Sequence, residues 1–267
     1  MRFPFDATNF SYHTIILQEA RKEYFLTVVF SEEMCIIEKQ EGVMKRKEIL
    51  KHVDHTLLKA AASRKEIEKL CEEAVKYHTA SVCVPSSYVR RIRGEYPTLR
   101  ICTVVGFPLG NGSTEAKAAE IIHALEDGAN EIDMVINIGA VKSGDYDYVT
   151  SEIAFLKELI GERILKVIVE TCYLTEEEKI KVCKCVTDGG ADYIKTSTGF
   201  GTGGATVEDV KLFKKYIGKN VKIKASGGIH TREEMETYLS LGVDRIGASG
   251  AVRLLASKGG CAEAADA

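Results

Sequence analysis

Ala-Asp-Tyr-Ile-Lys-Thr-Ser-Thr-Gly, at residues 191–199, has the pattern of a short strand followed by a tight turn, and Val-Lys-Ile-Lys-Ala-Ser-Gly-Gly repeats that pattern at 221–228. Lys195 and Lys224 lie 29 positions apart, about the length of one strand–loop–helix unit. If the two strands are neighbours in a parallel barrel, both ammonium groups point into one pocket, and each disfavours the charge of the other. Because a neutral amine is a nucleophile toward carbonyl groups, this spacing predicts Schiff-base chemistry.

Similar units recur along the chain. From about residue 44 onward, short β-branched runs alternate with longer helical patterns, as in repeated βα units. The expected strands lie at residues 53–56, 81–84, 100–105, 131–136, 165–170, 192–196, 221–225 and 244–248. Ser63, Thr175, Thr206 and Thr231 precede acidic first turns and indicate helix starts. The sequence therefore predicts an α/β fold of the (β/α)8 TIM barrel type, with eight parallel strands.

The first 43 residues do not follow this plan. They contain two apolar stretches, at 14–17 and 24–30, with the pattern of a hairpin, and no recognisable βα unit. We interpret residues 1–43 as an N-terminal extension, either a hairpin or poorly ordered, and residues 44–267 as a single catalytic barrel domain. An arm that packs on the barrel or on a second subunit is the alternative.

The composition favours a small-molecule partner. The 267 residues carry a formal net charge of −3, with Lys and Arg scattered among the acids, so there is no basic stripe of the kind that follows a nucleic-acid backbone. No apolar run approaches the roughly 20 residues that span a bilayer, and the N-terminus lacks the layout of a secretory signal. The eight cysteines include no repeated Cys-x-x-Cys pair, which is typical of reduced thiols. We therefore expect a cytoplasmic protein with no nucleic-acid or membrane partner.

Strand alternation turns several charged side chains toward the inside of the barrel. With Lys195 pointing inward, the same parity turns Lys224, Asp133, Lys166 and Glu170 inward. This is more charge than an inert core tolerates without pairing, and it clusters toward the carboxyl ends of the strands, where barrel enzymes build their sites. A buried ion-pair network that only fixes the packing is the alternative.

Glycine-rich turns follow three of the expected strands, at 198–204, 227–228 and 247–250. Backbone amides at such turns, next to helix N-termini, can hold a phosphate. Glycine also closes tight loops that bind nothing, so each turn alone leaves both interpretations open. Since the loops after strands seven and eight are a frequent phosphate site in this fold, the pattern favours a phosphate-binding role.

Five motifs occur in a fixed order. They are Val-Asp-His-Thr-Leu-Leu at 53–58, Ser-Val-Cys-Val at 81–84, Glu-Ile-Asp-Met-Val-Ile-Asn at 131–137, Tyr-Ile-Lys-Thr-Ser-Thr-Gly-Phe at 193–200 and Lys-Ala-Ser-Gly-Gly-Ile at 224–229. Together they resemble the deoxyribose-phosphate aldolase family, from about residue 44 to about residue 256. The resemblance implies a class I aldolase that reversibly cleaves 2-deoxy-D-ribose 5-phosphate to D-glyceraldehyde 3-phosphate and acetaldehyde in deoxyribonucleoside catabolism. It implies no metal and no other cofactor, and because members are often dimers it allows a homodimer.

The resemblance also implies roles for individual residues. Lys195 would form the Schiff base, Lys224 would be the neighbouring amine that keeps Lys195 partly neutral, and Asp133 would relay protons. Together with the inward set and the glycine turns, this gives the expected substrate-binding residues: Asp54, Thr56, Cys83, Lys166, Thr198, Gly199, Gly227, Gly228, Ser249 and Gly250. Of these, Gly228, Ser249 and Gly250 would hold the phosphate.

The chain departs from the family pattern at two places. Some members have a lysine directly after the Thr-Ser-Thr-Gly turn, where this chain has Phe200, so that phosphate binding would rest more on backbone amides. The C-terminal tail lacks the terminal tyrosine that some members fold over the site. A proton-transfer step assigned to that tyrosine is not carried over to this chain.

Three other functions are weighed against this interpretation. A metal-dependent class II aldolase would need converging histidines, whereas His52 and His55 are three apart on opposite faces of a strand, with His123 in a helix and His230 in a loop. A different phosphate-binding barrel, either an isomerase or another Schiff-base aldolase, explains the glycine turns but not the full motif set. A barrel that only binds sugar phosphates has no need of both lysines and Asp133.

Overall fold

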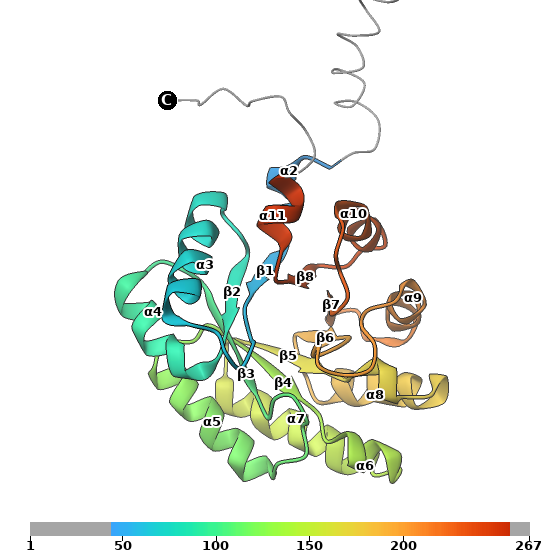
Figure 1. The fold of residues 1–267 in the computed structure, drawn as a ribbon. Coiled ribbons are helices and arrows are strands. Elements are labelled where there is room, and N and C mark those ends of the chain that lie inside the picture. Colours follow the sequence, from blue (N-terminus) through green and yellow to red (C-terminus); the bar gives the residue numbers. More distant parts are fainter. Residues whose placement is uncertain (1–43, 257–267) are drawn as a thin grey trace, which may run out of the picture. The chain divides into compact units, whose positions relative to one another are not determined.

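Residues 44–256 form a closed barrel of eight parallel strands (Figure 1). The structure is a computed structural model that describes these residues, so the predicted extension at 1–43 and the tail at 257–267 lie outside the described part. The strands are β1 (Val53–Thr56), β2 (Ser81–Val84), β3 (Ile101–Val105), β4 (Glu131–Val135), β5 (Ile164–Ile168), β6 (Tyr193–Lys195), β7 (Lys222–Ser226) and β8 (Arg245–Ala248). Each strand pairs with the next along the chain, and β8 closes on β1. The predicted (β/α)8 TIM barrel is confirmed.

Helices connect the strands and surround the barrel. They are α2 (Arg46–Leu50), α3 (Arg64–Tyr77), α4 (Val89–Glu95), α5 (Thr114–Glu126), α6 (Ile138–Lys142), α7 (Tyr146–Ile160), α8 (Glu176–Asp188), α9 (Val207–Tyr216), α10 (Arg232–Ser240) and α11 (Ala251–Ala256), with the 3₁₀ turns η1 (Ser86–Tyr88) and η2 (Thr171–Tyr173). Within this described range, none of the helices has the length and apolar character needed to cross a membrane.

Four of these helices begin where the sequence supplies a capping side chain. The side chains of Ser63, Thr175 and Thr231 each accept a hydrogen bond from the backbone N–H three residues later, and a glutamate at that position bonds back to the cap. Such capping boxes satisfy amides that have no partner inside the helix. Thr206 accepts a single bond of the same kind at the start of α9. The predicted helix starts are confirmed at all four positions.

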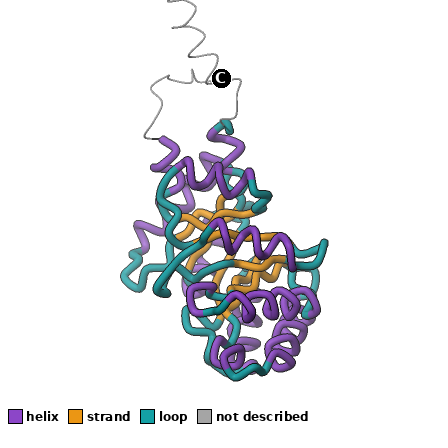
Figure 2. Tube along the Cα trace, turned by 90° about the vertical axis from the view of Figure 1, so that its right-hand side faces the viewer, coloured by secondary structure: helices purple, strands orange, loops and turns teal. Residues whose placement is uncertain are grey.

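Two layers of side chains fill the molecule. Helices surround the strands on the outside of the barrel (Figure 2). Outward-facing strand residues such as Ile132, Met134 and Ile194 are fully buried. The inner face carries charged residues, of which Asp133 and Lys224 have no exposed surface. Burial of the apolar outer layer drives folding, whereas the inner charges require partners within the barrel.

Strand β5 ends earlier than the sequence predicts. The expected strand runs to residue 170, whereas β5 ends at Ile168. Glu170 has a φ of 52°, in the left-handed region that an extended strand does not use. The chain therefore turns before Glu170, and strand alternation no longer fixes the direction of this side chain. The ends of the other strands differ from the predicted ones by one residue at most.

The burial pattern of α7 gives a stability prediction. Leu156→Ala removes a fully buried side chain from the face that α7 packs inward, and it is expected to lower the free energy of unfolding by about 2–5 kcal/mol. Phe155→Ala changes the adjacent, half-exposed position and is expected to cost less than about 1 kcal/mol. Urea unfolding followed by circular dichroism measures both variants. Equal losses would contradict the assignment of Leu156 to the core.

Candidate active site

Lys195 and Lys224 lie side by side on neighbouring strands. They are register partners in the β6–β7 pair, and both amines donate to the same oxygen, Oδ2 of Asp133, over 2.8 Å and 2.7 Å. Their side chains are buried, with 3% and 0% of their surface exposed. The predicted convergence of the two amines inside the barrel is confirmed.

Asp133 is the common partner of three amines. Its second oxygen, Oδ1, accepts a hydrogen bond of 2.8 Å from Nζ of Lys166 on β5. Burial alone would keep the Asp133 carboxyl protonated, but the charges of Lys166, Lys195 and Lys224 outweigh it and hold the pKa of Asp133 well below its usual value. Asp133 is therefore a carboxylate that can accept a proton only from a group directly bound to it.

A second set of charges lies around Lys166 and Lys224. Nζ of Lys166 lies 2.6 Å from Oε2 of Glu131, and Nζ of Lys224 lies 2.5 Å from Oδ2 of Asp54. Arg245 on β8 forms ion pairs with both Asp54 and Glu131. Sequence reasoning left Glu131 and Arg245 out of the site, although Glu131 is two residues from Asp133 and therefore shares its inward face.

The charges of this cluster do not balance. Among the described residues, its ion pairs join three carboxylates to four largely buried bases, namely Asp54, Glu131 and Asp133 with Lys166, Lys195, Lys224 and Arg245. Lys195 contacts one of these carboxylates, Lys224 contacts two and Lys166 contacts three. One base in excess of the carboxylates is costly to keep charged in a buried cluster. Of the three lysines, Lys195 thus has the fewest carboxylate partners.

The other two amines are held in their charged form. Burial opposes the charge of Lys224, but the carboxylates of Asp133 and Asp54 outweigh it and raise the pKa of Lys224. Burial likewise opposes the charge of Lys166, and Asp133, Asp54 and Glu131 are among the groups that raise its pKa. The cluster thus contains two firmly protonated amines next to Lys195.

A cavity of about 370 Å³ opens above Lys195. Its lining consists of Thr56, Leu57, Leu58, Lys59, Lys195, Thr198, Gly199, Phe200, Ser226, Gly227, Gly228, Ile229, His230, Gly247, Ala248 and Ser249. These residues come from the carboxyl ends of β1, β6, β7 and β8 and the loops after them. Seven of the predicted site residues line this cavity: Thr56, Lys195, Thr198, Gly199, Gly227, Gly228 and Ser249. Gly250 follows Ser249 but is not part of the lining.

Besides Gly250, three residues expected to bind substrate lie outside the lining. Asp54 and Lys166 are fully buried and lie one layer deeper in the barrel. Asp54 comes two residues before Thr56, which lines the cavity. Lys166 comes two residues before Ile168, which is the register partner of Lys195 at the cavity floor. Both carry ion pairs within the cluster. Cys83 is also fully buried and contacts the neighbouring strand. These three residues therefore lie beneath the cavity rather than in its wall.

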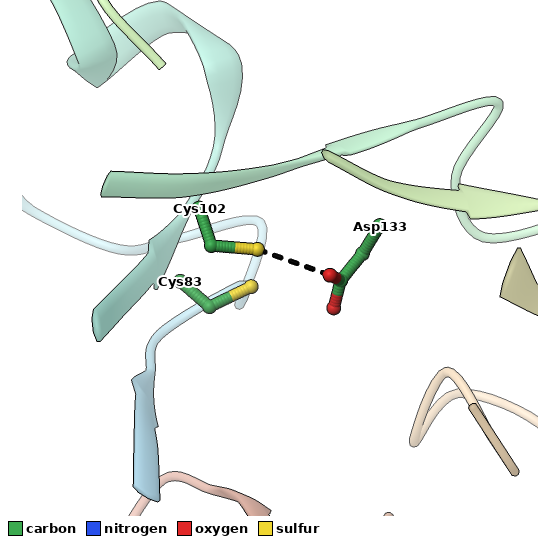
Figure 3. Close-up of side chains that lie close together, drawn as sticks. All are labelled: Cys83, Cys102 and Asp133. Atoms are coloured by element: carbon green, nitrogen blue, oxygen red, sulfur yellow. Dashed lines mark hydrogen bonds between the residues drawn. The ribbon is translucent and has the colours of Figure 1, made fainter. Parts of the chain in front are cut away.

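Cys83 and Cys102 lie on neighbouring strands with their sulfurs toward Asp133 (Figure 3). Sγ of Cys102 donates to Oδ1 of Asp133 over 3.1 Å. A hydrogen bond from Cys102 lowers the pKa of the Cys83 thiol despite its burial, whereas burial raises the pKa of Cys102 well above its usual value.

The two thiols and Asp133 are close enough together to be considered as metal ligands, and so are Asp54, Cys102 and Glu131. The ammonium of Lys166 contacts all three side chains of the second group and two of the three in the first, Cys102 and Asp133. Its Nζ lies 3.3 Å from Sγ of Cys102 and 2.8 Å from Oδ1 of Asp133. A metal cation would have to displace this buried ammonium, so these residues do not fit a metal ion.

Glu170 lies away from the amine cluster, which corrects the sequence-based expectation. Its left-handed backbone turns the buried carboxylate toward the loop after β6, where Oε1 accepts a hydrogen bond of 3.1 Å from the backbone N–H of Thr198 and Oε2 accepts one from the Thr198 hydroxyl. That hydroxyl in turn accepts from the N–H of Phe200 over 3.0 Å. Glu170 therefore fixes a turn that forms part of the cavity wall, and its strained backbone is typical of functional sites.

The loops after β6 and β7 pack closely against each other. A Cβ atom on Gly204 would lie only 2.2 Å from the carbonyl oxygen of Gly227, so this approach requires glycine. Gly227 itself has a φ of 80°, which also favours glycine. The predicted glycine turns therefore build one wall of the cavity from backbone.

Several known proteins with similar sequences and structures are aldolases. The sequence profile described as DeoC/LacD family aldolase matches residues 48–257. A deoxyribose-phosphate aldolase from Clostridium botulinum (strain Eklund 17B / Type B) is 63% identical over 213 residues, which cover 79% of this chain and 96% of that protein. One from Clostridioides difficile (strain 630) is 53% identical over 211 residues, covering 78% and 96%.

Solved structures of aldolases superpose on this chain as well. The aldolase QR15 superposes with a TM-score of 0.75 at 38% identity, covering 78% of this chain and 94% of that chain. The deoxyribose phosphate aldolase from Aeropyrum pernix, described as tetrameric, superposes with a TM-score of 0.73 at 29% identity, covering 81% and 93%.

The hydrogen bonds of Glu170 predict how its loss affects the turn. Glu170→Ala is expected to speed amide hydrogen exchange at Thr198 and Phe200 by about tenfold or more, because a charged acceptor contributes about 1.5–3 kcal/mol to a hydrogen bond. Glu170→Gln keeps one carbonyl oxygen as an acceptor, so its exchange rates should lie between those of the unmodified protein and those of Glu170→Ala. Exchange measured by NMR tests this, with Glu162→Ala, an exposed position just before β5, as the control. Unchanged exchange in Glu170→Ala would show that the turn does not depend on this carboxylate.

Proposed function

The chain belongs to the DeoC/LacD family of aldolases, and we propose that its buried amine cluster carries out class I aldol chemistry through a Schiff base at Lys195. Like its relatives, it is a deoxyribose-phosphate aldolase. It reversibly cleaves 2-deoxy-D-ribose 5-phosphate to D-glyceraldehyde 3-phosphate and acetaldehyde. It is therefore a carbon–carbon lyase that acts in deoxyribonucleoside catabolism.

One observation supports Lys195 as the nucleophile. Of the three amines around Asp133, Lys195 lines the cavity, whereas Lys166 and Lys224 are fully buried beneath it. It also has the fewest carboxylate partners of the three. A neutral amine that faces an open cavity is the arrangement needed for attack on a carbonyl group.

The proposed reaction follows from this arrangement. Nζ of Lys195 attacks the aldehyde carbon of the open-chain sugar, and loss of water from the carbinolamine gives a protonated imine. The imine draws the electrons of the bond between the second and third carbons toward nitrogen. As the hydroxyl on the third carbon loses its proton, this bond breaks, which leaves an enamine on Lys195 and releases D-glyceraldehyde 3-phosphate. Protonation of the enamine at the second carbon restores the imine, and addition of water then releases acetaldehyde and the free amine.

Asp133 and Lys224 are suited to move the protons of these steps. Asp133 contacts both amines through one oxygen, so a proton passed between them travels over two short hydrogen bonds. Lys224 is held in its charged form and supplies the positive charge that keeps Lys195 neutral. We propose Asp133 as the relay and Lys224 as the neighbouring acid.

The cavity wall is suited to the phosphate. We propose that Gly228, Ser249 and Gly250 hold it, with the turn at Thr198 and Gly199 completing the wall and Thr56 near the sugar. Holding the phosphate at the rim places the aldehyde carbon over Lys195, so that binding of the phosphate orients the substrate for attack by the amine. Asp54, Lys166 and Cys83 then support the amines from below.

Three further parts belong to the proposal. We propose that residues 44–267 are the catalytic domain, that the protein works as a homodimer and that it acts in the cytoplasm. Light scattering on the purified chain and cell fractionation test the last two.

Trapping of the imine tests the function. Acetaldehyde and borohydride are expected to leave a reduced ethyl group on the peptide that contains Lys195, and Lys195→Leu should lose the label and more than about a thousandfold in turnover while remaining folded. Lys222→Leu, an exposed position on β7, is the matched control and should be labelled normally. Peptide mass spectrometry reads the result. A label elsewhere, or none, would overturn the proposal and favour a barrel that binds sugar phosphates without this chemistry.

A further inference from the structure

The charge of the cavity lining points to an additional residue. Among the described residues, the lining contains no aspartate or glutamate, and its basic side chains are Lys59, Lys195 and His230. The amine of Lys195 is bound to Asp133 at the floor. Lys59 is exposed and is thus a basic group at the opening, in a wall that otherwise consists largely of glycine, hydroxyl and apolar side chains.

The topology places Lys59 beside the two glycine turns. It lies in the loop between β1 and α3, and β1 pairs with β8, where His55 is level with Ala248. Strand β8 pairs in turn with β7. The loops that carry Lys59, Ser249 and Gly228 therefore follow one another around the rim, and all three residues line the same cavity.

The position of Lys59 is fixed by its backbone, and its amine remains available. The carbonyl oxygen of Lys59 accepts a hydrogen bond of 2.9 Å from the N–H of Ala62, which holds the loop. In the part of the chain that the structure describes, none of the ion pairs of the adjacent helix α3 involves Lys59. Glu66 on α3 is close enough to interact electrostatically with Lys59, but no ion pair among the described residues holds the Lys59 amine, so a lysine at the mouth of a cavity whose lining contains no acids favours an anionic ligand.

The opposite side of the opening is apolar. Phe200, which follows the Thr198 turn, is half exposed and stacks edge-on against Phe107 with ring centroids 5.3 Å apart. The β6 side of the opening thus offers aromatic surface and the β1 side offers an ammonium group. A phosphorylated sugar with its aldehyde at Lys195 gains most by turning its phosphate toward Lys59 and the turns at Gly228 and Ser249.

We propose that Lys59 pairs with the substrate phosphate and gives the enzyme its preference for phosphorylated over unphosphorylated sugars. This inference rests on the proposed aldolase function and adds a specificity residue to it. A lysine suits the role because its ammonium is a point charge on a flexible stem that can follow the phosphate, as a charge-assisted hydrogen bond requires. Since the pair lies at an exposed opening, added salt weakens it.

Lys59→Met tests the proposal through a ratio of two substrates. The kcat/KM for 2-deoxyribose 5-phosphate is expected to fall about tenfold, mainly through KM, while that for unphosphorylated 2-deoxyribose stays within about twofold. Lys59→Arg should restore most of the loss. The matched control is Lys65→Met, which removes an exposed lysine on α3 outside the cavity lining and should leave the ratio unchanged.

Salt gives a second readout. Raising the ionic strength should reduce the preference of the unmodified enzyme for the phosphorylated sugar and have a smaller effect on Lys59→Met. An equal loss on both substrates in Lys59→Met, or an unchanged ratio, would overturn the inference. Borohydride trapping of acetaldehyde tests the aldolase function separately, because acetaldehyde carries no phosphate. If Lys195 is labelled but the ratio of the two substrates is unchanged in Lys59→Met, only the role of Lys59 is overturned.

Discussion

The carboxylate of Asp133 is the interaction on which the site depends. Three amines from three successive strands donate to its two oxygens, and this convergence exists only because the sheet closes on itself. Removing any charge from water is costly, so a cluster of this kind forms only where its members satisfy one another. We propose that a neutral Lys195 offsets the excess of one base over the carboxylates.

This arrangement explains where the cavity lies. The fully paired residues, such as Lys166 and Asp54, form the deeper layer and hold the cluster in place. Lys195 lies at the upper edge of the same cluster, with its side chain at the floor of the cavity. The walls are built from glycine turns and from the segment that Glu170 fixes. The cavity therefore has charged side chains at its floor and mostly backbone atoms around its opening.

Strand alternation predicted the inward direction of Asp133, Lys195 and Lys224, because a period of two is a local property of the sequence. It did not predict depth. Whether Lys166 lines the cavity or lies beneath it depends on the stagger between strands, which no single segment reveals. Glu170 was placed wrongly for another reason: its left-handed φ ends the alternation. Arg245 was missed because its ion pair with Asp54 joins the last strand to the first, and these two strands lie far apart in the sequence.

The pH dependence of imine trapping tests most directly whether Lys224 keeps Lys195 neutral. The rate of borohydride-trapped acetaldehyde adduct formation is measured across pH in the unmodified enzyme, in Lys224→Met and in the exposed control Lys222→Met. We expect the pH of half-maximal rate to rise by at least about one unit in Lys224→Met, because loss of one neighbouring positive charge leaves Asp133 free to stabilise a protonated Lys195, and to stay unchanged in the control. The same midpoint in all three proteins would contradict the account.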